Sequence, residues 1–265
     1  MTMNNGISFV ADMGYIVYTY AFNPEVWYAD MACQKYTMLS GCVLADENRF
    51  SYRKEHNKEY KANRKDYGDK PEHIKARAFW KELRCNAPYN GLHIISMFGA
   101  EGDDIVALLS IQEGLSIIGI DKDYYQIPNA TIHNAKGDTM GIREDKLPKA
   151  LEDVAWNNET WLLHLAINGD VSDNIPRLTP KGRSGLRLEY DALTADNPTE
   201  RAYKLFGDEF LDNLYQVILP YPKLVDTDMT REDVYELYSR GLWYDTVRNM
   251  TERIPLPNVG DIYGV

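Results

Sequence analysis

Acidic residues follow the apolar runs of this chain, and their placement constrains the fold more than any other feature of the sequence. The runs are short and nearly continuous, which is typical of strands that are buried on both faces. Four of them have this character: Ile7–Ala11, Gly41–Ala45, Leu92–Met97 and Leu115–Ile120. Because segments long enough for helices separate these runs, the sequence predicts an α/β fold with a mostly parallel central sheet flanked by helices.

The other segments predict helices and one edge strand. The expected helices cover about 15–22, 24–39, 71–84, 101–112, 156–168, 184–193, 199–215 and 230–239, and the expected edge strand lies near 130–134. From Asp145 onward the pattern is mainly helical and is interrupted by prolines. We therefore divide the chain into an α/β core over 1–150, with a basic segment at about 47–85, and a helical part over 151–265.

The acids at the ends of these runs predict a metal site. The candidates are Asp12, Asp46, Glu101, Asp103, Asp104, Asp121 and Asp123, together with Asp170 and Asp173 after the apolar run 161–167. The carboxyl ends of parallel strands meet at one edge of a sheet, so these side chains are expected to converge. Carboxylates held close together repel one another unless cations neutralise them. A set of ligands made only of oxygen is typical of Mg²⁺ or Mn²⁺.

The distribution of charge keeps nucleic acid among the expected partners. A net charge of -11 argues against a phosphate-binding protein. The segment from Arg49 to Arg84, however, holds twelve basic residues against six acidic ones, and aromatic residues such as Tyr52 and Tyr60 are interleaved with them. Such a segment is either a solvated helix of mixed charge or a surface on which bases stack.

Several other classes of protein are disfavoured. No apolar run approaches the length of a membrane span, and the first residues lack the pattern of a secretory signal. Three cysteines without paired spacing fit reduced thiols in a cytoplasm and not a zinc site. The five histidines do not form a spaced ligand set. We expect a cytoplasmic monomer that has no membrane partner.

Five blocks, in this order, resemble the flap endonuclease and 5'-to-3' exonuclease family, most closely its phage-encoded members such as the gene 6 exonuclease type of short-tailed phages. The blocks are Asp12 after the first strand, Asp46 ahead of Glu59–Lys65, Glu101–Asp104, Asp121–Asp123, and Gly169–Pro176. The resemblance covers roughly residues 9–184. It implies a PIN-like nuclease core, a helical arch and a helix-three-turn-helix element at about 156–193.

The resemblance also implies a two-metal phosphodiesterase whose two Mg²⁺ ions Mn²⁺ can replace. Asp12, Asp46, Glu101 and Asp103 resemble the first metal cluster, and Asp104, Asp121, Asp123, Asp170 and Asp173 resemble the second, with Asp103 close to both. The resemblance also implies a catalytic role for Asp12, Asp103 and Asp121. For any single acid, the alternative to a metal ligand is a helix cap or a solvated turn residue. Asp123, for example, could cap a helical turn.

Basic residues of the arch are expected to act on the scissile phosphate. Lys61 and Arg64 match the family's basic pair and are three apart on one predicted helical face, with Lys65 beside them as a DNA contact. Tyr60 matches a residue that stacks on an unpaired base, and simple packing is the alternative.

In the second half, the residues expected to bind duplex backbone are Lys181, Gly182, Arg183, Ser184 and Arg187. A K⁺ ion accompanies this element in relatives, but Pro180 removes one amide donor here. An ordinary proline-rich connection with a basic rim is the alternative for this turn.

The expected function is hydrolysis of DNA from 5' ends or at 5' flaps, and of RNA:DNA hybrids, to give 5'-phosphate products. Phosphate contacts of this kind recognise DNA shape and polarity, not base sequence. Three alternatives remain: a DNA-structure-binding protein without activity, a PIN-type ribonuclease, and a phosphatase that uses the Asp121–Asp123 pair.

Overall fold

A computed structural model describes residues 7–21, 42–47, 50–63, 70–86, 93–251, 253–254 and 256 of the chain. Its centre is a six-stranded sheet in the order β3-β2-β1-β4-β5-β6. The strands are β1 (Phe9–Asp12), β2 (Cys42–Ala45), β3 (His93–Ile95), β4 (Ser116–Ile118), β5 (Ile132–His133) and β6 (Thr139–Met140). Neighbouring strands from β3 to β5 are parallel, and β6 pairs antiparallel with β5. The expected fold class is therefore confirmed.

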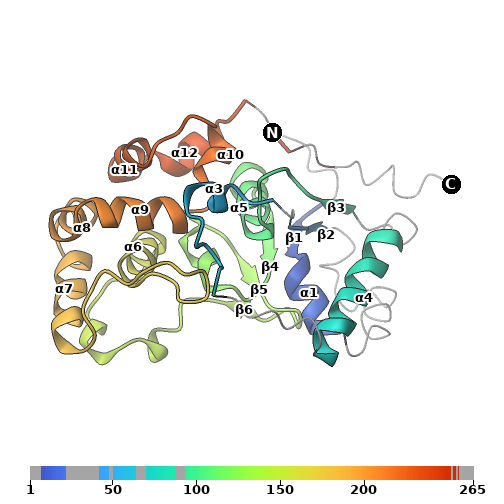
Figure 1. Cartoon of the computed structure of the whole chain (residues 1–265), viewed down its shortest axis with the longest axis horizontal. Helices are drawn as coiled ribbons and strands as arrows, with labels where there is room; N and C mark the ends of the chain where they lie inside the picture. Colours follow the sequence, from blue (N-terminus) through green and yellow to red (C-terminus); the bar gives the residue numbers. More distant parts are fainter. Residues whose placement is uncertain are drawn as a thin grey trace.

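Helices cover both faces of this sheet (Figure 1). On one face lie α1 (Met13–Tyr20) and α4 (Pro71–Asn86), which pack with Ala11, Leu44 and Ile118. On the other face lies α5 (Gly102–Glu113), within the larger core that includes Val10 and Ile117. Successive residues of one strand thus enter different cores, as the alternation of a pleated strand requires.

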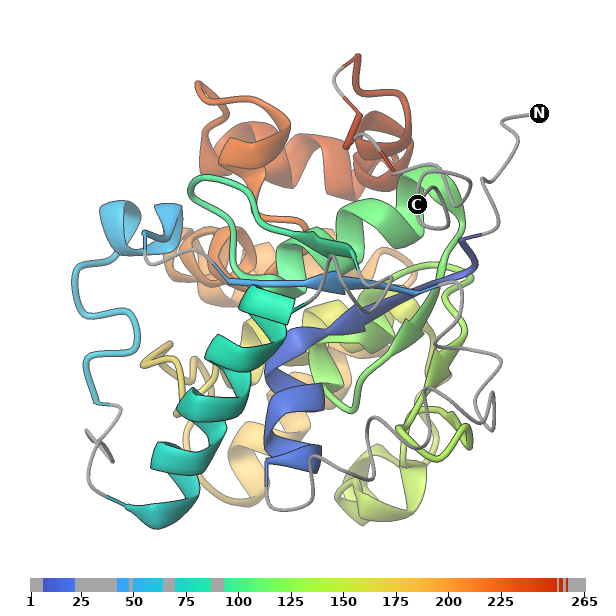
Figure 2. The same ribbon diagram turned by 90° about the vertical axis from the view of Figure 1, so that its right-hand side faces the viewer.

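The second half of the chain is helical and wraps around the α5 side of the sheet (Figure 2). Its helices are α6 (Asn158–Asn168), α7 (Arg183–Leu193), α8 (Pro198–Phe206), α9 (Asp208–Val217), α10 (Pro222–Val225), α11 (Arg231–Ser239) and α12 (Trp243–Arg248). Short helical turns η3 (Lys122–Gln126), η4 (Glu144–Lys146) and η5 (Lys149–Leu151) connect the sheet to them. Among the described residues, no helix is long and apolar enough to cross a membrane.

Local sequence signals explain where several helices begin. Asp12 accepts a hydrogen bond from the backbone N–H of Gly14 and caps α1, while Asn157 and Thr160 form a capping box at the start of α6. Pro198 occupies the first turn of α8, where the missing N–H costs nothing. The capping role of Asp12 fixes its side chain at the end of β1.

Most predicted elements are present, with three differences. The outermost strand is β6 and not the strand near 130–134, because the chain turns at Gly137 and pairs back on β5. The helix predicted over 199–215 is divided into α8 and α9 at Gly207, whose φ of 60 ends α8. The region around Lys61 forms a turn. The helix predicted at 24–39 lies outside the described residues.

One hydrophobic cluster extends from Ile7 in the first strand region to Val247 in α12 and includes α5, α6 and α9. The division at residue 150 stays a prediction, and the apolar core is continuous across it.

Candidate functional site

The parallel strands deliver acidic side chains to one edge of the sheet. Asp12 ends β1, and Asp46 follows β2, where its N–H donates to the carbonyl of Ile95. Glu101 precedes α5, and Asp121 follows β4 and caps η3 by accepting from the N–H of Asp123 at 2.9 Å. Because β1 to β4 run in the same direction, these four positions lie at the same end of the sheet.

At the centre of this edge, carboxylates influence one another strongly. Burial, with a contribution from Asp121, raises the pKa of Asp12 to about 6. Burial and the nearby charges of Asp12 and Asp121 raise the pKa of Asp103 well above its ordinary value. Burial and Asp121 raise the pKa of Asp123 to about 8. Such shifts mark a concentration of negative charge that the surrounding protein does not fully neutralise.

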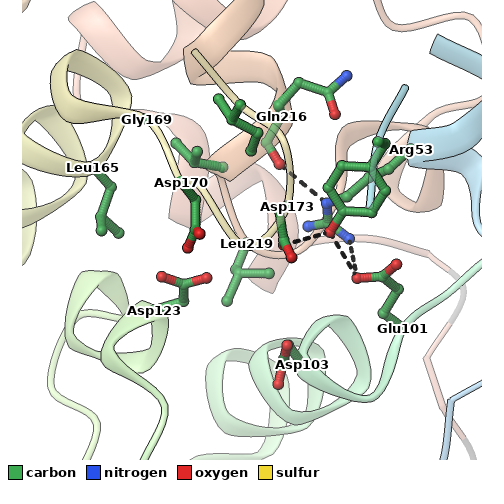
Figure 3. A pocket seen from close by; sticks show the side chains of 13 residues that line it. Arg53, Glu101, Asp103, Asp123, Leu165, Gly169, Asp170, Asp173, Gln216 and Leu219 are labelled. Atoms are coloured by element: carbon green, nitrogen blue, oxygen red, sulfur yellow. Dashed lines mark hydrogen bonds and ion pairs between the residues drawn. The ribbon is translucent and has the colours of Figure 1, made fainter. Parts of the chain in front are cut away.

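The turn after α6 brings two further acids to the same place. Gly169, with φ 63, is required there because a Cβ would lie 2.4 Å from the carbonyl oxygen of Ile175. A backbone bridge between Asp170 and Ile175 closes the turn. Asp103, Asp123, Asp170 and Asp173 line one small cavity of about 20 Å³ (Figure 3).

Glu101 occupies the opposite wall of this cavity and is surrounded by donors. The Nζ of Lys61 lies 2.7 Å from its Oε2, and the hydroxyl of Tyr60 donates to the same oxygen at 3.0 Å. Burial alone would raise the pKa of Glu101, but Arg53 and Lys61 outweigh it and lower the pKa to about 2. Glu101 is therefore ionised throughout the physiological range.

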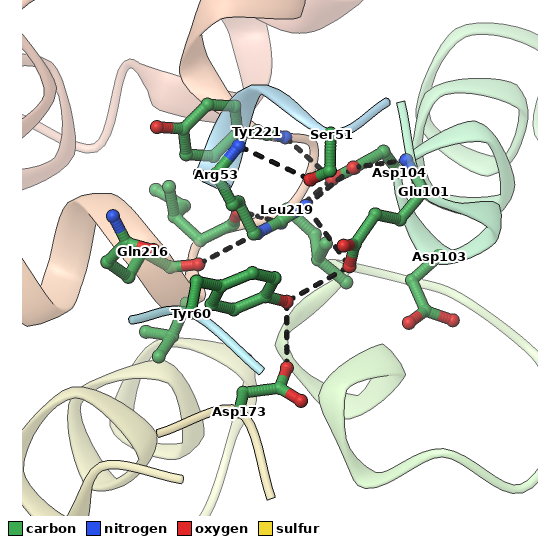
Figure 4. A network of polar contacts seen from close by, with 12 residues as sticks. Ser51, Arg53, Tyr60, Glu101, Asp103, Asp104, Asp173, Gln216, Leu219 and Tyr221 are labelled. Carbon is green, nitrogen blue, oxygen red and sulfur yellow. Dashed lines mark hydrogen bonds and ion pairs between the residues drawn. The ribbon is translucent and has the colours of Figure 1, made fainter. Parts of the chain in front are cut away.

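Asp104 is fully buried and holds other residues of the site in place. Its two oxygens accept from Arg53 at 2.6 and 2.8 Å, and also from the N–H groups of Glu101 and Tyr221 (Figure 4). This geometry leaves no oxygen directed at the cavity. That Asp104 is a metal ligand stays a prediction; in the structure its side chain holds Arg53 and the backbone of Glu101.

The solved structures that resemble this chain include proteins of bacteriophage T5. A T5 protein co-crystallised with metal ions superposes with a TM-score of 0.60 at 19% identity, over 92% of this chain and 99% of the other. A T5 flap endonuclease in complex with DNA and metal ions gives 0.58 at 17% identity, over 91% and 99%. A T5 5'-exonuclease with bound zinc gives 0.57 at 16%, over 90% and 99%. The chain has the fold of a phage 5' nuclease. No protein-family model matches the sequence, and no curated protein matches it.

On this 5' nuclease fold, the donor chemistry fits divalent metal ions. The acids that face the cavity provide only oxygen, and the buried Oδ1 of Asp46 has no hydrogen-bond partner. Within the described part of the chain, however, no three His, Cys, Asp or Glu side chains form a group that could hold an ion as they stand. Several carboxylates instead contact protein groups: Asp46 with Arg84 at 2.6 Å, and Asp170 with Lys122 at 2.6 Å. The oxygen-only set of donors thus fits divalent ions. Binding of these ions requires some of the side chains to turn away from their present partners.

Two predictions about the arch of the 5' nuclease fold need correction. Lys61 lies in a turn with φ 58 and not in the predicted helix. Tyr60 is 3% exposed and its hydroxyl lies within hydrogen-bond distance of both Glu101 and Asp173, so it is not available to stack on a base. The local sequence pattern predicted a helix here. It contains no sign that the carboxylates of Glu101 and Asp173 hold this segment. Arg64 and Lys65 lie outside the described residues.

The residues predicted to bind duplex backbone gather at the start of α7. Lys181, Gly182, Arg183, Ser184 and Arg187 are all exposed. Gly182 precedes the helix and provides no side-chain cap for its first backbone N–H groups. Asn213 of α9 supports the preceding turn by donating to the carbonyls of Ala166 and Pro176.

Sequence reasoning missed the residues that surround the acids. Arg53 was counted only as one charge of a basic segment, although it is 4% exposed and bonds to Asp104. Tyr124, which donates to Asp103 at 2.6 Å, and Lys122, which contacts Asp170, were not proposed at all. The available signal was their position, since both lie between or directly after the paired acids Asp121 and Asp123.

Proposed function

We propose that this protein is a metal-dependent 5' nuclease that hydrolyses DNA phosphodiesters from 5' ends and at 5' flaps, leaving 5'-phosphate products. The observation that carries the proposal is the convergence of acids from the ends of β1 to β4 and from the turn after α6, with Lys61 beside Glu101, on a fold shared with a T5 flap endonuclease. RNA:DNA hybrids belong to the same proposed substrate class, because contacts to phosphate do not read base sequence.

We assign two sets of residues to the metal ions. Asp12, Asp46, Glu101 and Asp103 would hold the first, and Asp121, Asp123, Asp170 and Asp173 the second, with several contacts through water. When bound, such a pair of ions lowers the pKa of water and stabilises the attacking and leaving oxygens. Mg²⁺ is the ion proposed, and Mn²⁺ satisfies the same oxygen donors. We do not assign K⁺ to the turn at Pro180.

The protein's own cations would orient the substrate. Lys61 is next to Glu101 at the edge of the cavity, so its ammonium can contact a phosphate oxygen and offset charge that develops there. The proposed ligand cluster excludes Asp104, which keeps Arg53 in place behind Glu101. The exposed cations and the backbone N–H groups at the start of α7 would hold the duplex through its backbone.

The test uses 5'-labelled and 3'-labelled duplex and 5'-flap DNA incubated with Mg²⁺, with Mn²⁺, or with EDTA. Products released from the 5' strand with Mg²⁺ or Mn²⁺, and their absence in EDTA, are the expected result. Binding of the flap without cleavage would instead indicate a DNA-structure-binding protein. Cleavage restricted to single-stranded RNA would indicate a PIN-type ribonuclease and would reject the proposal.

A further inference from the structure

Phe98 is the most exposed aromatic ring among the described residues, with 67% of its surface accessible. It lies in the connection between β3 and α5, three residues before Glu101. Exposure of so large an apolar ring is unfavourable in water. An exposed ring that the fold holds in place is typical of an interaction surface.

The ring is held in a defined aromatic stack. Phe98 lies on Phe50 with ring centroids 4.8 Å apart and an angle of 14° between the planes, and the edge of Tyr52 approaches at 5.9 Å. The backbone fixes the arrangement, because the N–H of Tyr52 donates to the carbonyl of Gly99 at 3.0 Å. Gly99 has φ 78, and a Cβ there would lie 2.2 Å from the Tyr52 ring. The platform of Phe50, Tyr52 and Phe98 is thus formed in the structure without a ligand.

The surroundings of the platform favour a nucleic-acid strand as its occupant. Tyr52 begins α3 (Tyr52–His56), and the same segment continues directly to Lys58 and Lys61. Lys223 places its Nζ 5.9 Å from the centre of the Tyr52 ring. Aromatic rings with nearby cations are the usual surface for single-stranded DNA, since every base has a flat π face and every nucleotide a phosphate. A purely apolar partner would gain nothing from these lysines.

Two other aromatic residues of the basic segment are too buried for this role. Tyr60 and Phe79 are each 3% exposed, so neither can stack on a base. The platform instead lies on the two segments that carry the candidate phosphate contact and Glu101: α3 leads to Lys61, and the 96–101 connection leads to Glu101.

We propose that Phe98, supported by Phe50 and Tyr52, stacks on an unpaired base of the 5' single strand of the substrate. The inference rests on the proposed function, since it assigns a base-binding subsite to the same nuclease. It predicts that the protein distinguishes flapped from blunt DNA partly through this ring.

The experiment measures binding in EDTA, where no cleavage occurs, to 5'-flap DNA carrying 2-aminopurine in the flap. Phe98→Ala should weaken flap binding about 5- to 100-fold, the range for loss of one base stack, and should relieve the quenching of 2-aminopurine fluorescence. Phe98→Trp should retain both. Blunt duplex should bind Phe98→Ala and the parent protein equally. Tyr203→Ala, which truncates an exposed aromatic ring of α8 that contacts Tyr235 of α11, is the matched control and should change neither property.

Replacing single flap bases by abasic sites locates the contact. At the contacted position the abasic change and Phe98→Ala should not be additive, because each removes the same stack. Equal loss for flap and blunt DNA, or loss confined to 3'-tailed DNA, would overturn the inference. So would unchanged DNA binding with a loss of self-association in sedimentation, which would make the platform a protein contact. If the parent protein neither binds nor cleaves flaps, the proposed function itself fails; if it does both and Phe98→Ala behaves identically, only the platform fails.

Discussion

Lys61 has an unusual backbone conformation, and its side chain contacts Glu101 of the candidate site. Its φ of 58 is uncommon for a residue with a side chain, and its N–H donates to the carbonyl of Asp173 at 3.0 Å while its Nζ reaches Glu101. A strained residue persists only where its surroundings over-determine it, and such residues cluster at functional sites. The sequence identified Lys61 through its motif but not this conformation, which depends on the distant turn at Asp173.

We expect Lys61→Met to lower kcat about 10²- to 10³-fold while changing affinity for DNA much less, because one positive group beside the reacting phosphate is lost. Single-turnover cleavage together with binding in EDTA separates the two effects. Lys58→Met, a change at an exposed lysine three residues earlier, is the control for loss of charge alone. Equal losses of rate in both variants would remove Lys61 from the catalytic group.

Asp121→Asn is expected to reduce turnover by about 100-fold or more with little change in folding or DNA affinity. Asparagine keeps the oxygen that accepts from the N–H of Asp123 and caps η3, but it lacks the charge that the proposed second ion needs. Steady-state cleavage and thermal unfolding measure the two properties, with Asp153→Asn at an exposed position as the control. Normal cleavage by Asp121→Asn would exclude the residue from the proposed metal ligands.

At the scale of elements, Arg53 joins three parts of the molecule. From α3 it bonds to Asp104 of α5 and to the carbonyls of Gln216 and Ile218 at the end of α9, and its guanidinium lies 4.8 Å from the ring of Tyr221. The sequence predicted most strands and helices because their periodicity is local. It could not predict this connection, because a buried arginine within a basic run has the same sequence pattern as an exposed one.

Arg53→Met should lower the free energy of unfolding by about 3–5 kcal/mol, since it leaves Asp104 charged and buried without its partner. Urea unfolding measures the loss, and Lys54→Met on the exposed face of α3 should cost less than about 0.5 kcal/mol. In the double variant Arg53→Gln with Asp104→Asn, part of the stability should return, with a coupling energy of about 1 kcal/mol or more. Additive single changes would mean that the pair does not act as a unit.

At the scale of the whole molecule, the sheet and the turn after α6 concentrate negative charge in a protein whose substrate is proposed to be a polyanion. The predicted alignment of strand ends was sufficient to place Asp12, Asp46, Glu101 and Asp121 at one edge. It did not reveal which acids are neutralised by the protein, namely Glu101 by Lys61 and Asp170 by Lys122, and which are left to repel one another. That distinction depends on side-chain packing between elements far apart in the sequence.

The acids left to repel one another make stability depend on pH and on metal. The pKa values of Asp12 and Asp123 are raised to about 6 and about 8, so between about pH 4 and pH 8 these two carboxyls bind more protons in the folded chain than in the unfolded chain. The free energy of unfolding therefore falls as the pH rises through this window in EDTA. Mg²⁺ binds the ionised carboxylates, so it should raise the melting temperature more at pH 8 than at pH 5, by roughly 5–10 °C when saturating.

Thermal unfolding with and without Mg²⁺ across this pH range measures the effect without relying on activity. Asp123→Asn removes one of the two raised groups, so it should flatten the pH dependence in EDTA and reduce the stabilisation by Mg²⁺, whereas Asp153→Asn should leave both unchanged. A melting temperature that rises with pH in EDTA, or an equal Mg²⁺ effect at pH 5 and pH 8, would contradict the view that these buried carboxylates form the ion-binding edge. The pH profile thereby tests the electrostatic design of the site separately from the chemistry proposed for it.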